Sequence, residues 1–87
     1  MNKEFIIKCI DIIDQIKLHS IVAITKYNEE LRYQVVYNKE NENYELLCLD
    51  EENAIWDNGE TIKDIKELLM CDSIVNRYEK IRLIEEE

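Results

Sequence analysis

The fold is decided by residues 20–49, which read SIVAITKYNEELRYQVVYNKENENYELLCL. This stretch contains three runs that are rich in β-branched, aromatic and other apolar residues, at 20–27, 31–38 and 44–49. Such runs are typical of β-strands, and the short polar links between them favour antiparallel neighbours. In the second run apolar and polar residues alternate, which predicts one face packed on a core, made of Leu31, Tyr33, Val35 and Tyr37.

Helices are predicted on both sides of these strands. Residues 3–18 repeat apolar side chains every three or four positions, and a second helix begins at Thr61, where Thr61 and Asp64 match a capping box. Ile74 and Val75 either extend that helix or pack beneath the next turn. Residues 80–85 alternate and predict a fourth strand at a sheet edge, before a solvated end at 85–87. We therefore expect one α+β domain over residues 1–87, an antiparallel β-meander with two helices in the order α-β-β-β-α-β.

The segment between the third strand and the second helix is predicted to be a loop. It runs from Asp50 to Glu60 and ends in Asn58-Gly59, a dipeptide that is typical of turns. Gly59 is the only glycine and proline is absent, so asparagine is expected to form most of the turns.

Acidic charge is concentrated around this segment. The chain has 20 acidic and 11 basic residues and a net charge of −9 at pH 7. Residues 40–60 contain no lysine or arginine and eight carboxylates: Glu40, Glu42, Glu45, Asp50, Glu51, Glu52, Asp57 and Glu60. Phosphates of bare nucleic acid and of anionic membranes would be repelled, whereas a basic protein surface would be attracted. Solubility is an equally good explanation of the net charge.

Trp56 lies inside the acidic segment. A large aromatic ring surrounded by carboxylates suits a protein interface, because the ring contributes buried area and the acids steer a basic partner. The partner-binding residues predicted on this basis are Glu40, Glu42, Glu45, Asp50, Glu51, Glu52, Trp56, Asp57 and Glu60. The alternative is that Trp56 fills the core beside the second helix and that the acids form a solvated loop around it.

The residues that usually carry catalysis are scarce. His19 is the only histidine, and the three cysteines, Cys9, Cys48 and Cys71, are widely spaced within apolar runs where thiols are usually buried. We therefore predict no catalytic, metal-binding or cofactor-binding residues and a reducing, cytoplasmic location. The N-terminus lacks a signal-peptide core, and no apolar run approaches the roughly 20 residues that span a bilayer.

In length, acidity and helix–meander–helix order, most of the chain resembles small phage-encoded proteins that disable host defence nucleases, of the anti-CRISPR and anti-restriction type. The resemblance involves no sequence motif. It implies a non-enzymatic inhibitor that occupies the basic nucleic-acid-binding surface of a nuclease or another nucleic-acid-binding protein. The alternative is a small cytosolic module that forms homodimers through its first helix or its edge strand. A small enzyme or redox protein built on a cysteine is a third hypothesis.

Overall fold

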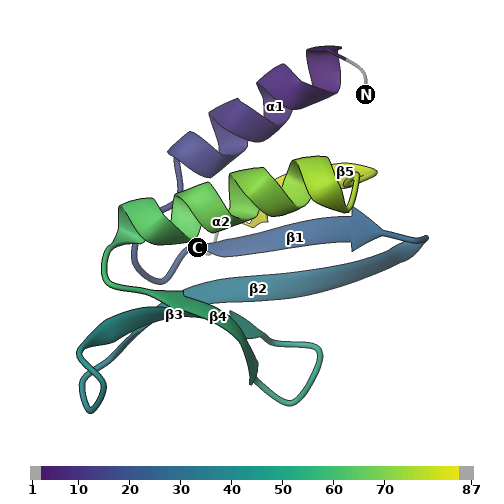
Figure 1. Cartoon of the computed structure of the whole chain (residues 1–87). Helices are drawn as coiled ribbons and strands as arrows, with labels where there is room; N and C mark the ends of the chain where they lie inside the picture. The colour runs from purple at the N-terminus through teal and green to yellow at the C-terminus, as the bar shows by residue number, and fades with distance from the viewer. Residues whose placement is uncertain (1–2, 85–87) are drawn as a thin grey trace.

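A computed structural model of the chain describes residues 3–84 (Figure 1). Its elements in chain order are α1 (Lys3–Asp14), β1 (Ile21–Lys26), β2 (Glu29–Asn38), β3 (Asn43–Cys48), β4 (Ala54–Gly59), α2 (Ile62–Val75) and β5 (Lys80–Ile84). The predicted α+β class and antiparallel meander are confirmed. Four strands precede α2 instead of three, so the order is α-β-β-β-β-α-β.

The strands form one antiparallel sheet in the order β4-β3-β2-β1-β5. β1 to β4 follow one another as hairpins, and β5 pairs with the other side of β1, so β4 and β5 are the edges. The predicted edge strand at residues 80–85 is thus confirmed as β5, except that residue 85 and the predicted solvated end lie outside the described residues. Both helices lie on one face of the sheet (Figure 1), where α1 packs on β5 and α2 packs on β3 and β4.

The core fills the space between the helices and the sheet. Cys9 and Ile13 of α1 and Ile65 and Leu69 of α2 pack there on seven buried residues of the sheet: Val22, Ile24, Tyr33, Val35, Leu46, Cys48 and Ile81. Fully burying one large aliphatic side chain stabilises the fold by about 1.5–3 kcal/mol. The alternation predicted for β2 holds in its middle. At its far end Tyr37 is 42% exposed.

The predicted loop at residues 50–60 is wrong, because most of it forms β4. This strand pairs with β3, with a register shift between Leu46 and Leu47 that marks a β-bulge. The sequence Ala54–Gly59 contains Ala, Asp, Asn and Gly, which are poor strand formers. Backbone pairing with β3 and packing of Trp56 against the core override that local preference.

Gly59 also differs from the prediction, because it ends β4 and does not form a turn. A Cβ atom added to Gly59 would lie 2.6 Å from the Cβ atom of Asp64. Asp64 belongs to the confirmed capping box of α2: its backbone N donates to Oγ1 of Thr61 at 3.1 Å, and its Oδ2 accepts from the Thr61 backbone N at 3.0 Å. Glycine is therefore needed for this close approach of β4 to α2.

The turns use left-handed backbone at residues other than glycine. Asn28 and Asn53 have φ angles of 63° and 59°, as expected for asparagine, but Tyr27, Glu42 and Glu52 also have positive φ angles. The end of α1 differs from the prediction, whereas α2 follows the first of the two alternatives given for Ile74 and Val75. α1 stops at Asp14 instead of residue 18, before a turn in which His19 has a φ of 73°, whereas α2 continues through Ile74 and Val75.

Replacing Gly59 with alanine should destabilise the fold. The new methyl group would overlap the side chain that caps α2, and overpacking of this kind costs typically 1–3 kcal/mol. Urea denaturation of Gly59→Ala should therefore show a lower free energy of unfolding than wild type. The matched change Asn58→Ala, at an exposed position of the same strand, should cost no more than about 0.5 kcal/mol. Equal stability of Gly59→Ala and wild type would contradict the close approach.

Candidate functional site

The carboxylates of residues 40–60 do not form one compact patch. Glu40 and Glu42 lie in the turn between β2 and β3, whereas Glu51 and Glu52 lie in the turn between β3 and β4. These turns are at opposite ends of β3, a strand of six residues, and are therefore about 20 Å apart. Asp57 on β4 and Glu60 just after it line hollows between β4 and α2. The accessible acids thus follow the β4 edge from one end to the other.

Glu45 is not available to a partner. Only 6% of it is exposed, and its Oε2 accepts a hydrogen bond from Nδ2 of Asn38 at 3.1 Å. It precedes the core residue Leu46 on β3, so it lies on the sheet face that the helices leave uncovered, with Val36 and Asn58 as cross-strand neighbours. The contact with Asn38 joins β2 and β3, so the role that the structure gives to Glu45 is structural.

Asp50 also has a structural role. Its Oδ1 accepts from Nη2 of Arg32 at 2.8 Å, and its Oδ2 accepts from the backbone N of Arg32 at the same distance. These hydrogen bonds fasten the β3–β4 turn to β2. The bonds from the side chain and then the backbone of Arg32 lower the pKa of the Asp50 carboxyl group below its ordinary value.

The other accessible acids of this segment have no cation paired with them in the described residues. Within residues 3–84, Asp50 is the only carboxylate of the acidic segment that forms an ion pair. The remaining six accessible or half-buried carboxylates are Glu40, Glu42, Glu51, Glu52, Asp57 and Glu60. Their charges therefore add to one another along the β4 edge, and no ion pair within the described part of the chain offsets this electrostatic cost.

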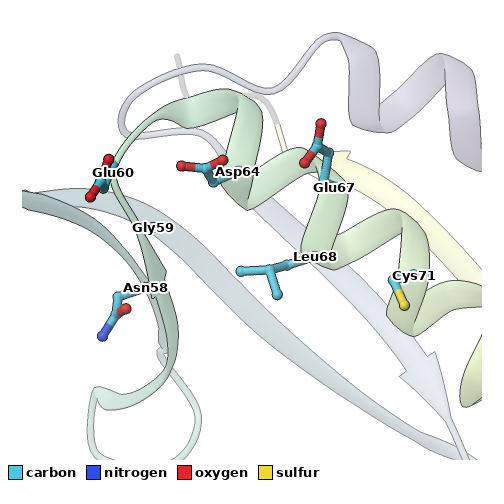
Figure 2. A pocket seen from close by; sticks show the side chains of 7 residues that line it. All are labelled: Asn58, Gly59, Glu60, Asp64, Glu67, Leu68 and Cys71. Carbon is cyan, nitrogen blue, oxygen red and sulfur yellow. The ribbon is translucent and has the colours of Figure 1, made fainter.

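A groove between β4 and α2 continues this acidic edge. Two adjoining hollows share Leu68 and Cys71 and together run from Glu60 to Val75; we call them the β4–α2 groove. Leu68 and Trp56, which are half-buried, give it an apolar floor, and the exposed Val75 also lines it. No lysine or arginine is among its lining residues, whereas five carboxylates are: Asp57, Glu60, Asp64, Glu67 and Asp72. Figure 2 shows three of them: Glu60 lies next to Gly59 at one end, and Asp64 and Glu67 project from α2, which also carries Leu68 and Cys71.

Trp56 contributes to the core as well as to this groove. The ring is half-buried and packs against the core, with its centroid 5.2 Å from that of Tyr33. The Nζ atom of Lys26 lies 5.2 Å from the ring centroid, within the range of a cation–π contact. These contacts agree with the alternative prediction that Trp56 contributes to the core, and the half-buried ring also lines the groove.

Sequence reasoning missed a polar cluster beneath the groove, which we call the Asp72 clamp (Lys26, Asp72 and Tyr78). Oδ2 of Asp72 accepts from the hydroxyl of Tyr78 at 2.6 Å and lies 3.2 Å from Nζ of Lys26, and Asn76 also donates to Asp72. Burial, followed by the hydrogen bond to Asp72, raises the pKa of Tyr78. Lys26 and Asp72 are 46 residues apart, so no local spacing could have indicated their contact.

Two of the three cysteines, Cys9 and Cys48, are buried. Burial raises the pKa values of the Cys9 and Cys48 thiols, which disfavours the reactive thiolate. Cys71 is exposed, contrary to the predicted burial of all three cysteines. Burial also raises the pKa of Tyr33 to about 12. Among the side chains of residues 3–84, no three histidine, cysteine, aspartate or glutamate residues form a metal-binding group, and no helix there is long and apolar enough to cross a membrane.

The contact between Arg32 and Asp50 should make stability depend on pH. A carboxyl group whose pKa is lowered by folding stabilises the fold above its unfolded pKa, and that contribution is lost as the pH falls through the folded pKa. Asp50→Asn should therefore be less stable than wild type near pH 7, and the difference should shrink in acid, as urea denaturation at several pH values would show. Glu51→Gln, which removes a carboxylate with no ion pair in the described chain, should be nearly neutral at pH 7. The interpretation fails if the Asp50→Asn deficit is the same at every pH.

No relative assists the assignment of this site. Comparisons of the chain with protein-family models, with curated protein sequences and with solved structures find no match. The contacts and charges of the chain itself are therefore the observations that can indicate a function.

Proposed function

We propose that this chain is a non-enzymatic acidic binding protein whose β4 edge occupies a basic, nucleic-acid-binding surface of another protein. The observation that supports the proposal is the uncompensated charge along this edge. Glu51 and Glu52 lie at one end, Glu60 and Glu42 at the other and Asp57 between them, and none forms an ion pair within residues 3–84. A basic partner would supply the missing cations.

The arrangement suits a surface that normally holds a phosphate backbone. Such surfaces carry rows of lysine and arginine, which attract any extended row of negative charge. Carboxylates spread over about 20 Å along one edge provide such a row, and their field would steer a basic partner into contact. Because β4 is an outer strand of the sheet, it can also offer backbone hydrogen bonds to an extended segment.

The residues of the acidic segment would have two roles, contact with the partner and support of the contacting residues. Glu51, Glu52, Asp57 and Glu60 would meet the partner, with Glu67 extending the contact along the groove. Asp50 and Asp64 would act indirectly, by holding the β3–β4 turn and the start of α2 in place. The biological setting that fits is inhibition of a nuclease in the cytoplasm, as in the phage counter-defence proteins that the chain resembles in size and acidity.

A pair of variants with the same net charge tests the proposal. Glu52→Gln/Glu60→Gln removes one carboxylate from each end of the β4 edge. Asp11→Asn/Glu29→Gln removes two exposed carboxylates from α1 and from the start of β2, two strands in from β4. Wild type and both variants would be used as baits in lysate of the host cells, and each captured protein would be purified. Its affinity for the chain and for a labelled DNA or RNA duplex would then be measured.

We expect the β4-edge variant to bind the captured protein about tenfold or more weakly than wild type, and the control variant to bind within about threefold. Adding wild-type chain should displace the duplex, and raising the salt concentration should weaken the complex by screening. A captured protein that binds the chain and the duplex together would contradict the proposal, as would equal losses in the two variants.

A further inference from the structure

One side of α1 is apolar and uncovered. Ile7 and Ile10 are 58% and 51% exposed, although isoleucine is usually buried. α2 runs antiparallel beside α1 (Figure 1), with Nζ of Lys66 donating to the backbone O of Asp14 at 2.8 Å. Ile10 and Met70 line an apolar groove between the two helices, and Ile74, one turn beyond Met70, is 55% exposed. The outer face of the helix layer therefore exposes apolar side chains on both helices, beside charged residues that also line the groove.

The exposed isoleucines belong to a regular stripe. Lys3, Ile7, Ile10 and Asp14 are spaced by four, three and four residues, which puts them on one line along α1. We call this line the α1 seam. The same alternation of three and four residues is found at the contact positions of coiled coils, where each helix presents such a stripe to its partner. The core-facing residues Cys9 and Ile13 lie beside the seam and are not part of it.

We propose that two copies of this chain pair through the α1 seam, with the two α1 helices antiparallel about a two-fold axis. An axis midway between Ile7 and Ile10 puts Ile7 of each copy opposite Ile10 of the second copy. Met70 and Ile74 then flank the contact, so the helices of both copies form one layer between two sheets. The proposal concerns a surface on α1 and α2 and does not depend on the function proposed for the β4 edge.

Charge complementarity favours a second copy over another occupant. The same axis puts Lys3 of each copy opposite Asp14 of the second copy, because both residues are four positions outside the isoleucine pair. Neither side chain forms an ion pair within residues 3–84, although Lys63 and Lys66 line the groove beside Asp14. A lysine in the first turn of a helix and an aspartate in the last are also disfavoured by the helix dipole. A contact with the opposite end of a second helix would compensate both charges.

The test is the oligomeric state of the full chain, measured by sedimentation equilibrium from low micromolar to submillimolar concentration. Wild type should change from monomer to dimer within this range. Ile7→Asp should raise the dissociation constant by about tenfold or more, because it places two new carboxylates in an apolar contact. The matched control is Ile55→Asp, an isoleucine of nearly equal exposure (56%) on β4, which should leave the dissociation constant within about threefold.

Exchanging the charges of Lys3 and Asp14 distinguishes pairing through the α1 seam from unspecific apolar association. Lys3→Glu should weaken the dimer, while its new carboxylate at the start of α1 favours the helix. Adding Asp14→Lys to Lys3→Glu reverses both charges and should restore most of the affinity. Circular dichroism would confirm that each variant is folded. The proposal is overturned if wild type remains monomeric throughout, if Ile55→Asp disrupts the dimer as much as Ile7→Asp, or if the charge exchange restores nothing.

Discussion

The Asp72 clamp is the contact on which the rest of the structure depends. One carboxylate near the end of α2 binds the last residue of β1 and the tyrosine that precedes β5, so three distant parts of the chain meet at a single group. The clamp joins the C-terminal part of α2 to the end of β1 and to the segment that leads into β5. It also holds the Lys26 ammonium group over the Trp56 ring, which connects β4 to the same cluster. Removing one member of such a partly buried network leaves the others without partners, which is far more costly than losing a surface ion pair.

The sequence predicts the parts of this fold that depend on local patterns. The meander follows from the alternation in residues 20–49, and the start of α2 follows from Thr61 and Asp64, whose capping box needs only neighbouring residues. β4 escaped prediction because its residues are poor strand formers and its pairing is supplied by β3. The predicted turn at Gly59 is wrong for the same reason. This position requires glycine because Asp64 approaches it closely across the groove, and not because the chain turns there.

In the acidic segment, too, local features can be predicted from the sequence and tertiary contacts cannot. Composition alone indicated that residues 40–60 carry excess negative charge, and most of these carboxylates are accessible and without cations in the described chain. Composition could not indicate that Glu45 is buried against Asn38 or that Asp50 is tied to Arg32, because both contacts depend on strand register. The groove that joins the acids of β4 to those of α2 is likewise a tertiary feature. Its apolar floor includes a tryptophan that the core already uses.

The position of β5 affects the tendency of this chain to aggregate at high concentration. β1 contains Ile21, Val22, Ala23 and Ile24, four buried residues without charge, and β5 covers one side of its backbone. Short uncharged segments of high β-propensity are the usual starting points of amyloid-like stacking. Any event that detaches β5, such as proteolysis between α2 and Lys80, would open that side of β1 while the hairpins of β1 to β4 could persist. By covering β1, β5 thus protects the chain from aggregation through that strand.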